Sequence, residues 1–156
     1  MGQEIERKFL ITNSDWQGQV EGQLYRQGYI PTTDNRTVRV RTVANTGYLT
    51  LKGPALNLVR SEFEYEIPLA DAQTMLDTLC EPPLIEKYRY RLPVDDVVWE
   101  IDEFLGANEG LLIAEVELTS PDQVVSLPSW IGDEVTGDPK YYNSNLARHP
   151  FQQWHR

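Results

Sequence analysis

Residues 3–11 read QEIERKFLI, a segment in which charged and apolar side chains alternate. Successive side chains of an extended strand point to opposite faces. Glu4, Glu6 and Lys8 therefore share one face, and the other face carries Ile5 and Phe9. An ordinary half-buried strand has the same pattern, with its charged face in water. The pattern of the remaining strands is needed to distinguish a charged face in water from one that binds a ligand.

The same period-two alternation predicts seven further strands, at residues 22–30, 36–44, 47–53, 60–68, 84–92, 97–105 and 111–119. Asn45-Thr46-Gly47 predicts a tight hairpin between two of them. Helices are expected at residues 70–80, with Asp71 as N-cap, at 120–127, and within 138–154 before Pro150. The pattern predicts one α+β domain over residues 1–156, dominated by antiparallel strands.

The composition narrows the class of protein. A net charge of −10 argues against a surface that tracks nucleic acid or an anionic membrane. Apolar runs are too short for a membrane span, and the start lacks a secretion-signal pattern, so we expect a cytoplasmic protein. Cys80 is the single cysteine and is expected to be a packed thiol. The two histidines, His149 and His155, lie in the C-terminal tail, so a metal would be held by oxygen ligands.

The charged faces of the predicted strands are sorted by sign. Arg39 and Arg41 form a basic row, and so do the three cations of residues 87–91, whereas Glu62, Glu64 and Glu66 form an acidic row. A face built for solvation usually intersperses charges, because like charges in one row repel. Two arrangements remain open: a twisted sheet with one wet face, or a sheet closed into a barrel with the charges inside.

A closed barrel of eight strands is wide enough for one small ligand. A lumen lined by carboxylates and cations is costly to desolvate unless a highly charged ligand fills it. Arginine and lysine rows would take phosphate oxygens, and acidic rows would take Mg²⁺ or Mn²⁺. The residues therefore favour a barrel that binds a polyanion together with divalent metal over an open sheet.

These charged positions also follow a known motif order. EIERK fits an ExExK signature, followed by Arg39 and Arg41 as RxR, Lys52 in LTLKGP, Glu62 and Glu64, Lys87 and Arg89 as KxR, Asp102 in WEID, and Glu115 and Glu117 in AEVEL. From Glu4 to about Asn145 the chain resembles the CYTH superfamily, the triphosphate tunnel metalloenzymes. The resemblance implies an eight-stranded antiparallel β-barrel with a few flanking helices, forming a tunnel.

The resemblance also implies roles for the charged residues. Metal binding falls to Glu4, Glu6, Glu62, Glu64, Asp102, Glu115 and Glu117. Phosphate binding falls to Lys8, Arg39, Arg41, Lys52, Lys87 and Arg89, which together with Glu4 and Glu6 form the expected catalytic set. Lys140 is the candidate for a C-terminal lysine that plugs one mouth of the tunnel. Tyr29 either lines the tunnel or is a packed aromatic.

The function expected from this resemblance is hydrolysis of a triphosphate that depends on Mg²⁺ or Mn²⁺. Inorganic tripolyphosphate is the expected substrate, because no residues build an obvious base pocket and Trp99 points to the outer face. The alternatives are an adenylyl cyclase or thiamine triphosphatase on the same cradle, or a non-enzymatic module that binds polyphosphate or a nucleotide. The expected binding partner is a small triphosphate, and binding to nucleic acid or to a membrane is not expected. The apolar outer faces of the strands allow a homodimer.

Overall fold

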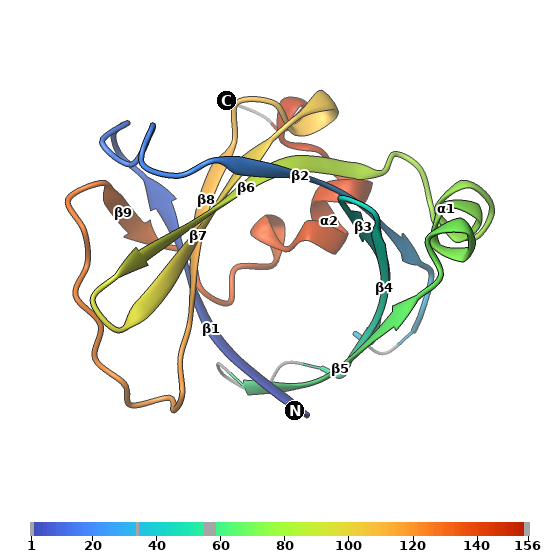
Figure 1. Cartoon of the computed structure of the whole chain (residues 1–156), viewed down its shortest axis with the longest axis horizontal. Coiled ribbons are helices and arrows are strands. Elements are labelled where there is room, and N and C mark those ends of the chain that lie inside the picture. Colours follow the sequence, from blue (N-terminus) through green and yellow to red (C-terminus); the bar gives the residue numbers. More distant parts are fainter. Residues whose placement is uncertain (1, 34, 55–58, 155–156) are drawn as a thin grey trace.

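The computed structural model describes residues 2–33, 35–54 and 59–154, so His155 lies outside the described residues. Its main feature is a closed antiparallel barrel (Figure 1). The eight barrel strands are β1 (Gln3–Ile11), β2 (Gly22–Ile30), β3 (Thr37–Val43), β4 (Thr46–Lys52), β5 (Val59–Ile67), β6 (Ile85–Val94), β7 (Val97–Phe104) and β8 (Leu112–Glu117). All eight predicted strands are confirmed within two residues at each end.

Strand β1 closes the barrel by pairing with strands from both ends of the sheet. Its first residues pair with β5, with Glu4 opposite Arg60, and its middle pairs with β8, with Lys8 opposite Glu115. The remaining order is β5-β4-β3-β2-β6-β7-β8. A short ninth strand, β9 (Ile131–Glu134), pairs with the end of β1 and was not predicted. The segment that opens the chain therefore decides the closure.

The hairpin between β3 and β4 forms one residue earlier than predicted. Val43 pairs with Thr46, so the turn consists of Ala44 and Asn45, with Ala44 at φ 53°. Gly47 lies in the strand, where a Cβ would come within 2.6 Å of the Ala72 side chain. This glycine is needed for the close approach of a helix to β4, not for the turn.

Helix α1 (Leu69–Thr78) confirms the predicted helix and covers β3 and β4 (Figure 1). It begins after Pro68, so Asp71 lies in its first turn and is not the N-cap. Leu76 packs with Val40 and the buried thiol of Cys80, as expected for a packed cysteine.

The predicted helix at 120–127 is wrong. The segment forms a turn followed by extended chain. The Thr119 N–H and hydroxyl both donate to Gln123 Oε1, at 2.6 and 3.0 Å, and Val124 is 92% exposed. Of the three aliphatic residues only Val125 packs against the core, so burial gives a helix little support and the local side-chain bonds favour a turn.

The C-terminal segment closes one end of the barrel. It consists of η2 (Pro139–Tyr141), α2 (Asn143–Arg148) and η3 (Phe151–Gln153), and η3 lies near η1 (Gly106–Asn108). Figure 1 looks down the barrel and shows α2 within the ring of strands. Leu146 of α2 is fully buried against Ile85, Phe104 and Ile113. Each of these three residues lies two positions along its strand from a charged residue, namely Lys87, Asp102 or Glu115, and so faces the same side of the barrel wall. The inner face of the barrel therefore changes from charged to apolar at this end.

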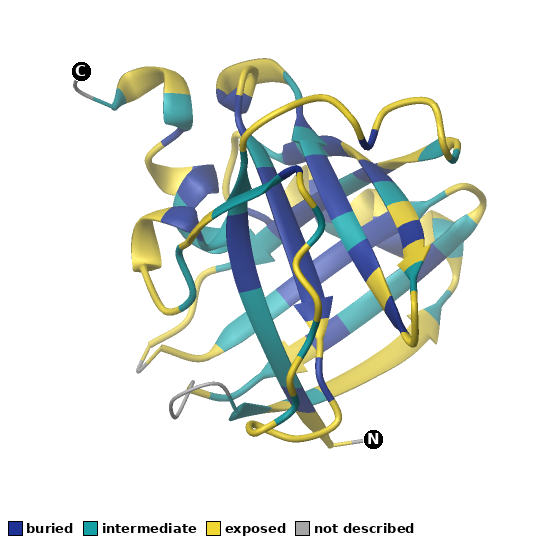
Figure 2. Cartoon of the chain, turned by 90° about the vertical axis from the view of Figure 1, so that its left-hand side faces the viewer, coloured by how far each residue is buried: buried dark blue, intermediate teal, exposed yellow. Residues whose placement is uncertain are grey.

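The outer face of β1, β7 and β8 forms a separate apolar layer. Figure 2 colours the chain by burial and shows strands in which buried residues are frequent. Trp99 is fully buried there, with the rings of Phe9 and Trp130 at 5.5 and 5.8 Å. Trp99 thus points to the outer face, as predicted. Within the described part of the chain, no helix is both long enough and apolar enough to cross a bilayer.

Candidate active site

The barrel lumen contains a cavity of about 490 Å³ walled largely by charged side chains. The predicted metal and phosphate ligands that line it are Glu4, Glu6, Lys8, Arg39, Arg41, Lys52, Glu62, Glu64, Lys87, Arg89, Glu115 and Glu117. The rows of opposite sign therefore face one shared space, and the alternative of an open sheet with a wet face is wrong. Arg60 and Arg91 also line this cavity.

One wall of the lumen carries an excess of negative charge. Glu6 and Glu117 are directly opposite each other on β1 and β8, and like charges in such a pair are destabilising. Burial, and then the nearby Glu115 carboxylate, raise the pKa of Glu6 to about 8. Burial, followed by the carboxylates of Glu4 and Glu62, also raises the pKa of Glu117. This wall would gain stability from a bound cation.

Two other carboxylates on this side are already held by cations. Lys8 Nζ lies 2.5 Å from Glu115 Oε2, and Arg89 Nη2 lies 3.3 Å from Glu115 Oε1. Lys52 Nζ donates to both oxygens of Glu4, at 3.0 and 3.1 Å. Burial would raise the pKa of Glu115, but Lys8 and Arg89 outweigh it and hold that pKa well below its usual value. Glu4 and Glu115 are thus largely neutralised by the protein itself.

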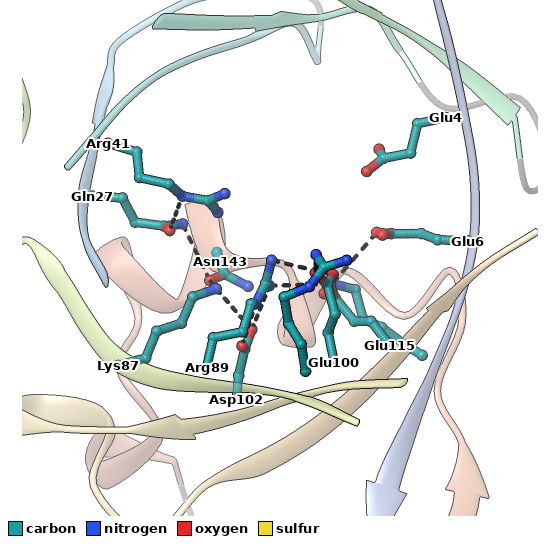
Figure 3. A network of polar contacts seen from close by, with 12 residues as sticks. Glu4, Glu6, Gln27, Arg41, Lys87, Arg89, Glu100, Asp102, Glu115 and Asn143 are labelled. Atoms are coloured by element: carbon teal, nitrogen blue, oxygen red, sulfur yellow. Dashed lines mark hydrogen bonds and ion pairs between the residues drawn. The ribbon is translucent and has the colours of Figure 1, made fainter. Parts of the chain in front are cut away.

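Asp102 lies behind the lumen wall and is fully buried. It accepts from Lys87 Nζ at 2.7 Å, and from Arg89 Nε and Nη2 at 2.7 and 2.8 Å (Figure 3). Burial opposes ionisation, yet Arg89 and Lys87 lower the pKa of this carboxyl below its usual value. Its surroundings differ from those expected of a metal ligand, because both oxygens already bind cations. The placement suits Asp102 to orienting Lys87 and Arg89.

The opposite wall carries an excess of positive charge. Arg41 makes no ion pair within the described residues, and its Nε donates to Gln27 Oε1 at 2.8 Å. Burial, and then the neighbouring Arg39 and Arg89, lower the pKa of Arg41 to about 9. The Arg41 and Arg89 guanidinium carbons lie 4.8 and 5.1 Å from the Tyr25 ring centre, which holds both cations near the lumen.

Two further observations show that this wall is short of anions. Arg39 Nε is buried and has no hydrogen-bond partner in the part of the chain that the structure describes, an uncommon state for a charged donor. Burial lowers the pKa of Lys87 to about 7 despite Asp102, with Arg89 and Arg41 adding to the effect. An anion with several oxygens would satisfy these groups together.

The oxygen-rich wall fits a hard divalent cation. No group of three His, Cys, Asp or Glu side chains converges into a complete metal site within residues 2–33, 35–54 and 59–154. However, Glu6 and Glu117 face each other, burial raises the pKa of Glu62 as well, and carboxylate oxygens are the donors that Mg²⁺ and Mn²⁺ prefer. Glu64 instead accepts from Thr50 Oγ1 at 2.7 Å and lies 3.4 Å from Arg39 Nη2.

The structure does not bring Lys140 into the lumen with the other predicted phosphate ligands. Its Nζ lies 4.4 Å from the ring centre of Trp154 and 5.4 Å from that of Tyr141, and it does not line the cavity. The aromatic pair outside the lumen attracts its ammonium. Asn143, three residues further on, lines the cavity instead.

Sequence reasoning missed Asn143 and the role of Gln27. Asn143 Oδ1 accepts from Lys87 Nζ at 2.7 Å and from Gln27 Nε2 at 3.3 Å (Figure 3). Tyr29 lines the lumen and accepts from Gln27 Nε2 at 2.8 Å. Strand parity relates Gln27 to Tyr29, but no periodicity in the C-terminal segment signals Asn143.

Comparison with known proteins adds a family assignment to this geometry. The family model described as "CYTH domain" matches residues 2–146. An inorganic triphosphatase from Acetivibrio thermocellus is 49% identical over 154 residues, covering 99% of both chains. An inorganic triphosphatase from Nitrosomonas europaea is 38% identical over 149 residues, covering 92% of this chain and 96% of the relative.

Solved structures resemble the barrel as well. A crystal structure of an inorganic triphosphatase has a TM-score of 0.66 and 34% identity, covering 92% of this chain and 96% of its own. A putative adenylate cyclase from Bacillus halodurans has a TM-score of 0.61 at 19% identity, covering 78% of this chain and 84% of its own, and shows likeness of fold alone.

Proposed function

This chain belongs to the CYTH domain family, and on that premise we propose that it hydrolyses inorganic tripolyphosphate inside the barrel lumen with the help of a divalent metal. The proposal depends on one observation: two walls of opposite charge face each other across one cavity. The arginines and lysine of one wall lack enough anionic partners, and the carboxylates of the other lack enough cationic partners. A triphosphate with bound metal supplies both. The curated relatives support this choice of substrate, since both are inorganic triphosphatases.

The basic wall would bind the phosphate chain. The forked donors of Arg39, Arg41 and Arg89 suit phosphate oxygens, and Lys87 adds a point charge. In the transition state negative charge is spread over the phosphoryl oxygens and develops on the leaving oxygen, so fixed cations inside a lumen would stabilise it more than they would in water. Asp102 holds Lys87 and Arg89, and Tyr25 lies against Arg41 and Arg89, before substrate arrives, which limits reorganisation during the reaction.

The acidic wall would hold the metal. Glu6 and Glu117 are the proposed principal metal ligands, and Glu4 and Glu62 are the proposed additional ones. Glu115 would lie between these carboxylates and the cations Lys8 and Arg89. A bound Mg²⁺ or Mn²⁺ supplies neutralisation of phosphate oxygens and a water of lowered pKa. Glu115 keeps Lys8 and Arg89 directed into the same space. The chemistry needs no protein nucleophile.

Phosphate release from tripolyphosphate, ATP and thiamine triphosphate, each with Mg²⁺, with Mn²⁺ or with chelator, tests the proposal. We expect release from tripolyphosphate that requires divalent metal, and loss of turnover in Glu117→Gln with the fold retained. Tight binding without release would favour a binding module, and cyclic AMP from ATP would favour a cyclase. Near-normal activity of Glu117→Gln would remove Glu117 from the metal site.

A further inference from the structure

Asn143 brings an uncharged side chain of the C-terminal segment into the charged lumen. It is the first residue of α2 and lines the cavity between β2 and β6 (Figure 3). Its Oδ1 accepts from two donors of different strands: Lys87 Nζ at 2.7 Å and Gln27 Nε2 at 3.3 Å. Asn143 thus joins the segment that closes the barrel to one cation of the proposed phosphate-binding wall.

Gln27 continues this connection to a second cation. Its side chain is fully buried, and its Oε1 accepts from Arg41 Nε at 2.8 Å. Its Nε2 donates to both Asn143 and Tyr29. A continuous path of hydrogen bonds therefore runs from Lys87 through Asn143 and Gln27 to Arg41, across strands β6, β2 and β3.

The chemistry of an amide explains why these two positions are not carboxylates. Lys87 and Arg41 are cations in one buried site and repel each other, so each needs an acceptor to hold its position. A carboxylate would do so by neutralising them, as Asp102 does on the other side of Lys87. An amide oxygen accepts the same hydrogen bond without adding a further negative charge beside the two cations, so less of their charge is cancelled before an anionic ligand binds.

We propose that Asn143 and Gln27 form an amide bridge that positions Lys87 and Arg41 for the phosphate chain. The C-terminal segment is then part of the phosphate-binding site as well as a cover for the end of the barrel. Both amides are positioning residues, since they act through the cations. This inference rests on the proposed hydrolysis of a triphosphate.

A double-mutant cycle between Asn143→Ala and Lys87→Met tests the bridge, with kcat and KM measured on tripolyphosphate. The loss of a hydrogen bond to a charged group predicts a fall in kcat/KM of roughly 10- to 150-fold for Asn143→Ala alone. In the Lys87→Met background we expect the same change to cost less than about threefold, because the group it positions is gone. Fully additive effects would overturn the proposal.

A second cycle supplies the matched control. Lys52 is also a lumen lysine, but it is held by Glu4 on the acidic wall and does not contact the bridge. Asn143→Ala and Lys52→Met should therefore be additive within about threefold. Equal coupling in both cycles would indicate a general loss of structure and would count against the bridge.

Asn145→Ala separates positioning from stability of the segment. Asn145 lies in α2 as well, and its Nδ2 donates to the Pro139 carbonyl at 2.7 Å, outside the catalytic cavity. We expect this variant to lower the melting temperature and leave kcat/KM unchanged. A loss of kcat/KM equal to that of Asn143→Ala would show that only the fold of α2 matters.

The conservative variant Asn143→Asp gives an independent readout. It keeps an acceptor for Lys87 and adds a negative charge, so we expect kcat to recover toward wild type while KM for tripolyphosphate rises. A kcat as low as that of Asn143→Ala would contradict the bridge. If the wild type releases no phosphate, the proposed hydrolysis fails, and the same cycles are then evaluated from the Kd for tripolyphosphate, so that the two failures are distinguished.

Discussion

Glu6 and Glu117 are direct cross-strand neighbours on β1 and β8, and both side chains line the lumen. Within the described residues Glu117 makes no ion pair, and Glu6 makes only a long one, to Lys8 Nζ at 3.9 Å. Two ionised carboxylates in this position would weaken a sheet, which favours a proton on Glu6 when no cation is bound. The pair lies between two strands that are otherwise regularly paired. Such an unfavourable pair lowers the stability of the fold and is typical of a binding site.

The free energy of unfolding of the metal-free protein should fall as pH rises from about 5 to 7. The pKa of Glu6 is about 8 in the fold against an ordinary 4.5, so the folded state keeps a proton that the unfolded state loses in this range. Folding then becomes less favourable as pH rises. Lys87, with its pKa lowered to about 7, acts in the opposite direction only above that pH.

Urea unfolding at several pH values, with and without the Glu6→Gln substitution, checks this slope. The glutamine variant should show a shallower decline between about pH 5 and 7, and higher stability than wild type at pH 7. An identical decline in both proteins would show that Glu6 does not hold the proton.

Asp102→Asn should destabilise the fold by about 3–5 kcal/mol, because it leaves Lys87 and Arg89 buried without their common counter-charge. The size of the effect follows from the complete burial of Asp102 and its three short hydrogen bonds. Glu134→Gln is the control, since it breaks a partly exposed pair with Arg7 and should cost under about 1 kcal/mol. Equal losses in the two variants, measured by urea unfolding, would contradict the anchoring role.

Arg41→Met should separate stability from activity. The substitution removes a buried cation that repels Arg39 and Arg89, so the free energy of unfolding should change by less than about 1 kcal/mol or rise. The kcat/KM for tripolyphosphate should fall roughly 10²-fold or more, as for loss of one preorganised donor. A strongly destabilised variant would show that Gln27 and Tyr25 depend on Arg41 for their own packing.

Tripolyphosphate and Mg²⁺ together should stabilise the protein more than the sum of their separate effects. Each ligand removes the charge excess of one wall and provides counter-charge for the other. A ligand present at about 100 times its Kd raises the free energy of unfolding by about 2.7 kcal/mol. Thermal unfolding with each ligand alone, with both, and with chelator measures this coupling. Strictly additive shifts would mean that the two walls bind their ligands independently.

The period-two patterns were sufficient to predict all eight barrel strands, because alternation is a local property that sheet formation preserves. Features without such periodicity were mispredicted. The four-residue β9 is too short to alternate clearly, and residues 120–127 have helix-like termini, but only Val125 of their three aliphatic residues packs against the core. The β3–β4 turn lies one residue earlier than predicted, and Gly47 lies in the strand against Ala72, a contact that only the tertiary structure reveals.

The sequence by itself determined which side chains face the lumen, since strand parity assigns each charge to one side of the wall. Tertiary structure alone decided how those charges share partners. Closure of the barrel leaves Glu6 beside Glu117 but surrounds Asp102 with Lys87 and Arg89, so chemically similar carboxylates acquire different pKa values. It also placed Asn143 in the lumen and Lys140 outside it. Electrostatic energies depend on distance and burial, and neither quantity is encoded in the spacing of residues along the chain.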